Sequence, residues 1–358
     1  MRIFIDIGHP AHVHYFRNFI HIMQEKGHVF CITARNRSMI HYLLQKYELP
    51  FCDRGKGKNG IGGKLVYMIF ADILLLTKAF RFKPDLYLSF ASPYAAQTAW
   101  IMRKPHIVMD DTEHARFGHL FYKPFSSVFL NPSCFYKKFG GKQIFFNSYM
   151  EYCYLHSNYF KPTIRIYSLL GISNQEKYVI LRFVSWQANH DIGQSGLNDV
   201  TKLELIEILE KKYKVFISSE GNLKDDRLSK YLINIPAEYM HDTLYYADFF
   251  ITESGTMASE AAILNTPVVY VNSLPLMGYL QDEEKEGILF HYNNSDGVKE
   301  KVVEMMNIPD IKETFKPKNL KLLENKINPT QFLVWFIENY PASVRIMKEN
   351  PDYQDRFR

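Results

Sequence analysis

Short apolar runs alternate with amphipathic stretches along the whole chain. Runs rich in β-branched and aromatic residues predict strands at Ile3–Ile7, Val29–Thr33, Leu86–Ser89, Ile107–Met109, Tyr178–Phe183, Lys214–Ser218, Phe249–Thr252 and Pro267–Val271. Apolar positions at helical spacing predict helices at Tyr15–Lys26, Thr201–Lys212 and Thr256–Leu264. This alternation is typical of an α/β fold built on parallel sheets.

The strand–helix pattern restarts near Tyr178, after a polar stretch at residues 171–177. The chain has 358 residues, more than one core usually holds, so two domains are expected. We expect two Rossmann-like domains, residues 1–170 and 171–328, whose parallel sheets face a central cleft. Residues 329–358 are expected to form a helical tail that packs back on the first domain.

Charge is distributed unevenly along the chain. Residues 1–165 contain 22 Lys and Arg against 10 Asp and Glu, a net charge of +12, whereas the remainder carries −7. A basic first half favours an anionic partner such as phospholipid or a lipid diphosphate, although it also fits an ordinary solvated surface. Nucleic acid is not expected as a partner, because the sequence contains no motif for binding it.

The cysteines and the N-terminal residues indicate where the protein is located and whether it binds a metal. The four cysteines lack a C-x-x-C pair and ligand-like spacing to histidine, so we expect no metal site and reduced thiols in a cytoplasm. The sequence MRIFIDIG predicts a strand instead of a signal peptide. We therefore expect a cytoplasmic protein.

Two aromatic and basic segments suggest a face for a membrane. Residues 64–83 are apolar with flanking lysine and arginine, and a second such segment covers residues 117–123 and 125–129. The first is too short to span a bilayer and carries Asp72. Both segments are predicted to lie peripherally on the inner leaflet of the cytoplasmic membrane. The alternative, favoured for Leu74–Leu76, is a core helix.

The loop after the first strand is rich in histidine. Residues 8–14 read GHPAHVH and should lie at the ligand-facing edge of the sheet. His12 or His14 is a candidate general base or phosphate contact, because histidine titrates near neutral pH. The alternative is that some of these histidines cap the following helix or pack. The loop lacks G-x-G-x-x-G, which disfavours nicotinamide dinucleotides.

An acidic run, Asp110-Asp111-Thr112-Glu113, follows the strand predicted at Ile107–Met109. Carboxylates past a strand's carboxyl end could position a base or bind sugar hydroxyls, and Asp110 is nearest to that end. Capping of a helix by Asp111 or Thr112 explains the same residue types equally well.

The stretch at residues 253–271 predicts strand, tight turn, helix, turn and strand. Ser254, Gly255 and Thr256 would present backbone N–H groups and a positive helix end, which suits a diphosphate. Glu260, one turn further, could accept hydrogen bonds from a ribose diol. This combination indicates a nucleotide-sugar enzyme.

With these motifs the chain resembles the GT-B glycosyltransferase superfamily, most of all a branch that starts with a strand and a GHPAHVH-type loop. It is distantly similar to the lipid-linked N-acetylglucosaminyltransferase of peptidoglycan synthesis. That family's loop ends in Gly-His-Val, matched by Ala11-His12-Val13, and its Ser-Gly and Ser-Glu-Ala motif is matched by Ser254-Gly255 and residues 259–262. At fold level the resemblance covers nearly the whole chain.

The resemblance implies roles for particular residues. His12 would be the base, with Asp110 as the other candidate, and Glu260 would bind the donor ribose. Acceptor contacts are expected from Gly8, His9, His14 and Glu113. Residues 182–186 depart from the family's Gly-Gly-Ser loop, and Arg182 and Ser185 are expected to help hold the donor phosphates there.

The implied function is a metal-independent, inverting glycosyltransferase. It would move a sugar from a uridine nucleotide sugar to a lipid-linked or cell-surface glycan. No cofactor is expected, because the nucleotide sugar is a co-substrate. One alternative is a non-hydrolysing UDP-sugar 2-epimerase, which shares the fold and an acidic-Ser-Gly motif matched by residues 253–255, with Asp110 or Glu113 in acid/base roles. Another is a non-catalytic nucleotide-sugar-binding protein.

Overall fold

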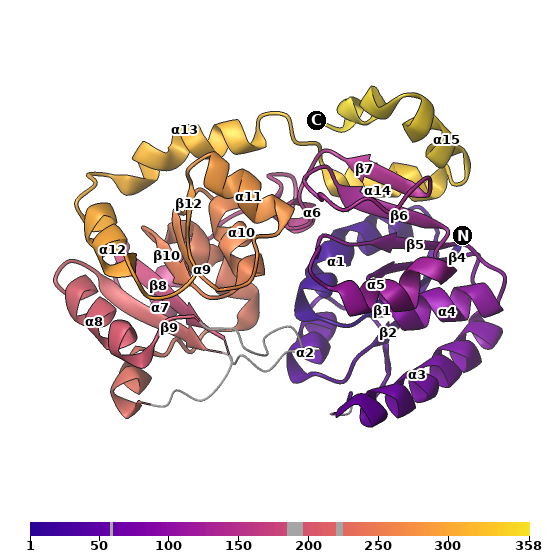
Figure 1. Cartoon of the computed structure of the whole chain (residues 1–358), viewed down its shortest axis with the longest axis horizontal. Coiled ribbons are helices and arrows are strands. Elements are labelled where there is room, and N and C mark those ends of the chain that lie inside the picture. Colours follow the sequence, from indigo (N-terminus) through magenta and orange to yellow (C-terminus); the bar gives the residue numbers. More distant parts are fainter. Residues whose placement is uncertain (58–59, 185–195, 220–224) are drawn as a thin grey trace. The chain divides into compact units, whose positions relative to one another are not determined.

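The chain is divided into two units (Figure 1). A computed structural model describes residues 1–57, 60–184, 196–219 and 225–358. Unit 1 comprises Met1–Tyr159 and Lys326–Arg358, and unit 2 comprises Phe160–Asn325. The C-terminal segment thus belongs to the same unit as the N-terminus.

A parallel sheet lies at the centre of unit 1. Its strands are β1 (Arg2–Ile7), β2 (Val29–Ala34), β3 (Cys52–Asp53), β4 (Leu86–Phe90), β5 (His106–Met109), β6 (Val128–Pro132) and β7 (Gln143–Phe146). They lie in the order β3-β2-β1-β4-β5-β6-β7 (Figure 1). In register, Asp6 of β1 lies beside Thr33 on one side and Ser89 on the other.

The helices of unit 1 form two groups. They are α1 (Pro10–Glu25), α2 (Ser38–Lys46), α3 (Gly60–Phe82), α4 (Pro93–Ile101), α5 (Arg116–Tyr122), α6 (Tyr152–Leu155), α14 (Pro329–Glu338) and α15 (Ala342–Glu349), with 3-10 turns η1 (Lys123–Phe125) and η4 (Pro351–Phe357). In one group α3, α4 and α5 pack side by side, and in the other α1 contacts α2, α6 and α14. The connections through α1 and α2 add strands on one side of β1, whereas those through α3, α4 and α5 add strands in the opposite direction. Because such connections are right-handed, the two sets of helices lie on opposite faces of the sheet.

Unit 2 has its own parallel sheet, in the order β12-β11-β10-β8-β9 (Figure 1). The strands are β8 (Tyr178–Phe183), β9 (Lys214–Ser219), β10 (Phe250–Thr252), β11 (Val268–Val271) and β12 (Leu289–Tyr292). The helices are α7 (Arg165–Leu170), α8 (Asp199–Leu209), α9 (Met240–Tyr246), α10 (Gly255–Ile263), α11 (Gly278–Lys285), α12 (Val298–Met306) and α13 (Ile311–Leu323), with 3-10 turns η2 (Asp226–Tyr231) and η3 (Ala237–Tyr239).

The prediction of an α/β fold with two parallel sheets is confirmed. Strands such as β4 and β11 are buried along their whole length, because helices cover both faces of the sheet, and this is why they read as continuous apolar runs. The apolar runs of β6 and β12 were not assigned as strands from the sequence.

One part of the membrane interpretation is wrong. Residues 125–129 were expected to face a bilayer, but Val128 and Phe129 are buried in β6, inside unit 1. In α3, Leu75 is buried, as the core-helix alternative predicts for this part of the sequence. Within the described part of the chain, no helix combines the length and apolar character needed to cross a membrane.

Each sheet has one point where the strand order reverses. In unit 1 this point lies between β1 and β4, and in unit 2 between β8 and β10. Loops that leave neighbouring strands at such a point diverge to opposite faces and open a crevice, where ligands of α/β proteins bind. The loops concerned within the described residues are those after β1, β4 and β10, and the loops after β1 and β10 carry residues singled out in the sequence.

Candidate functional site

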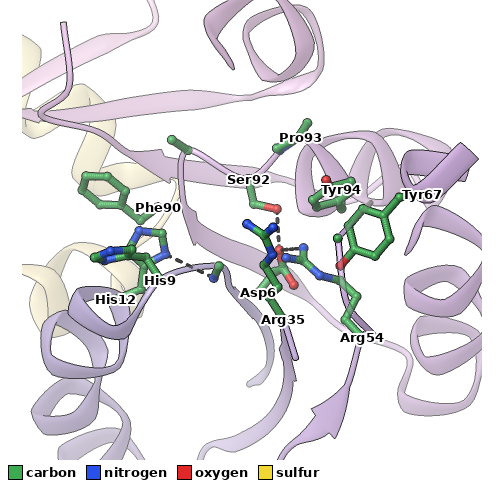
Figure 2. A pocket seen from close by; sticks show the side chains of 13 residues that line it. Asp6, His9, His12, Arg35, Arg54, Tyr67, Phe90, Ser92, Pro93 and Tyr94 are labelled. Carbon is green, nitrogen blue, oxygen red and sulfur yellow. Dashed lines mark hydrogen bonds and ion pairs between the residues drawn. The ribbon is translucent and has the colours of Figure 1, made fainter. Parts of the chain in front are cut away.

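Unit 1 has a pocket of about 280 Å³ at its strand-reversal point (Figure 2). It is lined by Asp6, Gly8, His9, His12, Arg35, Arg54, Gly57, Tyr67, Phe90, Ala91, Ser92, Pro93 and Tyr94. We call it the β1–β4 pocket. Its walls are the loops after β1, β2, β3 and β4, the starts of α1 and α4, and one side chain of α3.

Three residues of the histidine-rich loop lie in this pocket. Gly8 donates its backbone N–H to Nδ1 of His12 (3.3 Å), and His9 caps α1 by accepting the Ala11 N–H at its own Nδ1 (3.3 Å). The His12 ring also packs on Phe90, with ring centroids 4.7 Å apart. His9 therefore both caps the helix and lines the pocket.

The His12 side chain is neutral at physiological pH. Burial, with smaller contributions from His9 and Arg54, lowers its pKa well below the ordinary value of 6.5. Since Nδ1 accepts the Gly8 N–H, the neutral ring carries its proton on Nε2 in this conformation.

A buried hydrogen-bond network around Asp6 forms the floor of the pocket (Figure 2). Asp6 accepts from Thr33 at Oδ1 (2.8 Å) and from Ser92 at Oδ2 (2.5 Å). It also forms an ion pair with Arg54, whose side chain is as deeply buried and stacks over Tyr94 at 4.3 Å. The network joins four segments of unit 1, and none of its members was predicted from the sequence.

His14 lies in the core of unit 1 and not among the pocket residues. Its ring packs against Tyr154, with centroids 5.1 Å apart, and against Tyr47 at 5.7 Å. This position gives His14 a packing role, one of the alternatives weighed for the loop.

Asp110 follows β5 and is buried, outside the β1–β4 pocket. Its Oδ1 accepts the Thr112 N–H (2.9 Å), and its Oδ2 accepts the Tyr122 hydroxyl and lies 3.0 Å from His119 Nε2. Asp110 thus holds the start of its own loop and ties it to α5.

The other acids of the run are also buried. Glu113 accepts the Tyr136 N–H (3.3 Å), and burial, together with Glu151 and Asp110, raises the pKa of Asp111 well above its ordinary value. The suggestion that Asp111 or Thr112 caps a helix is wrong. Helix α5 begins only at Arg116, and its cap, Ala115, makes no side-chain hydrogen bond.

In unit 2, the residues predicted to hold a diphosphate lie together at the start of α10. Ser254 is the N-cap, and Gly255 and Thr256 begin the helix, all three half-buried. Ser254 N–H donates to Thr252 Oγ1 (2.9 Å). A Cβ on Gly255 would lie 2.9 Å from Met277 Cε and 3.3 Å from the Tyr279 hydroxyl, so this position accommodates only glycine without displacement.

Arg182 and Glu253 lie at the same edge of this sheet. Arg182 is the penultimate residue of β8, lies in register with Thr252 of β10, and donates from Nη1 to Ser218 Oγ (2.6 Å). Glu253 is buried, and its two carboxylate oxygens accept the N–H groups of Val184 and Leu197, each at 2.9 Å. Ser185, also predicted to bind the donor, lies outside the described residues.

Glu260 lies in α10, one turn after this helix start, and is buried. Its Oε1 is 3.1 Å from Nε2 of His241 in α9. A histidine partner of this kind was not expected from the sequence. It orients one carboxylate oxygen of Glu260 toward α9. In the described part of the chain, no group of His, Cys, Asp and Glu is arranged to hold a metal ion.

Comparison with known proteins assigns this chain to a family and identifies a relative. A family model described as "Protein of unknown function (DUF354)" matches residues 1–325, so the chain belongs to this family. "Uncharacterized protein MJ0665" of Methanocaldococcus jannaschii is 24% identical over 307 residues, which is 82% of this chain and 88% of the relative.

Solved structures of the same fold include epimerases and glycosyltransferases. The S. aureus MnaA–UDP structure is 14% identical, covering 96% of this chain and 97% of that one, with a TM-score of 0.66. The M. jannaschii UDP-GlcNAc 2-epimerase bound to UDP-GlcNAc and UDP is 15% identical, with coverage of 87% and 94% and a TM-score of 0.62. SsfS6, a glycosyltransferase of Streptomyces sp. SF2575, is 12% identical, with coverage of 95% and 100% and a TM-score of 0.59. The predicted GT-B-like fold is thereby confirmed.

Proposed function

We propose that this protein is a metal-independent, inverting glycosyltransferase that uses a nucleotide sugar, with uridine as the base. Unit 2 binds the donor and unit 1 binds the acceptor, a lipid-linked glycan. Support for the nucleotide comes from the start of α10, where helix dipole and N–H groups favour a diphosphate, and from neighbours of the same fold that bind UDP or UDP-GlcNAc.

The observation that carries the proposal is that α3 lines the β1–β4 pocket with one side and exposes apolar residues on the other. Its inner side places Tyr67 in the β1–β4 pocket, whereas its outer side is apolar and exposed. The outer residues recur at helical spacing and are each more than half exposed: Val66, Ile69, Phe70, Ile73 and Phe80. We call them the α3 apolar face. The exposed cations Arg81 and Lys83 follow it directly.

This arrangement suits an acceptor that has a sugar end and a lipid end. An apolar helix face with cations at its border lies in the interface of an anionic bilayer. The pocket on the other side of the same helix would receive the sugar. An epimerase acts on its nucleotide sugar alone and has no need of such a face.

In the proposed reaction, the acceptor hydroxyl oxygen attacks the anomeric carbon of the donor. The bond from that carbon to the diphosphate oxygen breaks, UDP leaves, and the hydroxyl proton passes to a base. His12 is the proposed base, since it is neutral and lines the pocket, whereas Asp110 is buried elsewhere. Accepting the proton at Nε2 requires the tautomer that is protonated at Nδ1, in which the Gly8 N–H loses its acceptor at a cost of about 1–3 kcal/mol.

A UDP-sugar 2-epimerase is the second candidate function. The Glu253-Ser254-Gly255 sequence and the epimerases among the fold neighbours favour it. In this chain, however, the Glu253 carboxylate holds the backbone at Val184 and Leu197.

The product of turnover separates these functions. Purified protein is incubated with a panel of uridine nucleotide sugars, with and without a bacterial lipid extract, and the products are identified by mass spectrometry. We expect release of UDP that depends on lipid, with donor affinity reduced about tenfold or more in Glu260→Gln. An isomerised nucleotide sugar formed without lipid would establish the epimerase. Absence of both turnover and nucleotide-sugar binding would refute both enzymes.

The α3 apolar face provides a second prediction. Replacing Ile69 and Ile73 together by Ser should weaken binding to vesicles containing anionic phospholipid by about tenfold or more, because two exposed aliphatic side chains no longer enter the interface. Vesicle flotation measures this binding. The thermal midpoint should hardly change, since both residues are exposed. A matched pair of exposed aliphatic side chains outside the α3 apolar face, Val200→Ser with Leu320→Ser, should bind like the parent. Equal binding by all three proteins would contradict the membrane role.

A further inference from the structure

Arg35 is a cation of the β1–β4 pocket without a counterion there. It directly follows β2, is half-buried, and reaches into the pocket beside Asp6 and Arg54 (Figure 2). Its guanidinium forms no hydrogen bond or ion pair with any residue in the described ranges. Since burial removes part of its hydration, a bound anion would gain more from this cation than from a solvated one.

Gly57 makes room for this arginine. A Cβ at position 57 would lie 2.4 Å from Nη2 of Arg35 and 3.1 Å from its Cζ. A larger residue would therefore displace the guanidinium, although the flexible arginine side chain could move at little cost to stability. The absence of a side chain at residue 57 thus leaves room for the Arg35 guanidinium in this position.

The acids near the pocket do not neutralise Arg35. Asp6 is the acid of the pocket lining, and its oxygens are engaged by Thr33, Ser92 and Arg54. Asp72 of α3 interacts electrostatically with Arg54, but burial raises its pKa to about 7, so it is partly protonated at neutral pH. The pocket therefore carries a net positive charge.

Two helix starts add to this charge. His9 caps α1 and Ser92 caps α4, so both helices direct their positive ends toward the pocket. Tyr67, Phe90 and Tyr94 supply apolar ring surface around the same space. The pocket thus combines charge for an oxyanion with aromatic surface for a sugar ring.

We propose that the β1–β4 pocket binds an acidic sugar unit of the acceptor, one that carries a carboxylate or phosphate, and that Arg35 is the residue that selects for this oxyanion. This inference rests on the proposed function, because it takes the ligand of unit 1 to be a glycosyl acceptor. A guanidinium pairs with two oxygens of either oxyanion through parallel hydrogen bonds, and a neutral sugar offers no such partner.

Titration calorimetry with the full chain tests this proposal without any nucleotide sugar. The probes are glucuronate, glucose 1-phosphate and glucose. We expect at least one of the two acidic sugars to bind tenfold or more tightly than glucose, and the better one identifies the oxyanion. Arg35→Gln should remove this preference, and Gly57→Ala should reduce it while leaving the thermal midpoint in place. Arg37→Gln, an exposed neighbour outside the pocket, is the control and should retain it.

Equal binding of the three sugars, absence of binding, or a preference that survives in Arg35→Gln would overturn the proposal. Failure here is distinguishable from failure of the proposed function. Transfer to a neutral acceptor together with equal sugar binding refutes the acidic-sugar proposal alone. Binding of an acidic sugar that depends on Arg35, in a protein that transfers nothing, refutes the glycosyltransferase alone.

Discussion

Replacing Arg54 with Met lowers the free energy of unfolding by about 3–5 kcal/mol, because the substitution leaves the buried Asp6 carboxylate without its counterion. Methionine fills much of the same space, so the loss reports on the charge more than on the volume. Urea denaturation of the full chain, followed by circular dichroism, measures it.

Arg35 offers a matched control for this measurement. It is an arginine of the same pocket, but it is half-buried and makes no ion pair within the described residues. Arg35→Met should therefore stay within about 0.5 kcal/mol of the parent. Similar losses in both variants would show that the Asp6–Arg54 pair has no special weight in stability.

His12→Asn should lower kcat by about 10²–10⁴, the range that general bases contribute. The Asn Oδ1 can still accept the Gly8 N–H, so the loop keeps its hydrogen bond while the base is lost. Initial rates of UDP release at saturating donor and acceptor give kcat. His21→Asn, on an exposed position of the same helix, is the control and should behave like the parent.

The pH profile of the parent enzyme carries a second signature of His12. A base works in its unprotonated form, and the pKa of His12 lies well below 6.5, chiefly because of burial. The value of kcat/KM, which reports on the free enzyme, should therefore stay on its plateau as the pH falls through 6.5 and decline only at lower pH. An acid limb at or above pH 6.5 would exclude His12 as the base, as would unchanged kcat in His12→Asn.

The sequence predicts the core of this fold because burial on both faces leaves a local signal. β1, β8 and β10 are apolar runs followed by turns and helices, and each was found from its own residues. β3 could not be found in this way, since it is only two residues long and is defined by its pairing with β2. The acidic run was ambiguous for a related reason: its residue types suit a helix cap, but the helix begins only at Arg116.

Only those parts of the candidate sites that are formed by contiguous residues were predicted from the sequence. The loop at residues 8–14 and the start of α10 are contiguous motifs, and their positions follow from the strands before them. Asp6, Arg54 and Ser92 meet because β1 lies between β2 and β4, an order that no local pattern encodes. In the sequence, Asp6 is a single charged residue within an apolar strand. Its burial is explained only by Thr33, Ser92 and Arg54, which bind its carboxylate in the folded chain.

The Asp6 network also has a consequence for synthesis of the chain. Its members are separated by up to 86 residues, and the last of them, Ser92, starts the helix after β4. A nascent chain that has not yet exposed Ser92 and α4 therefore lacks one wall of the pocket and one donor to its buried carboxylate. Ligand capture by unit 1 must await the arrival of that segment outside the ribosome, and in shorter translation intermediates the Asp6 carboxylate remains hydrated because its buried network is incomplete.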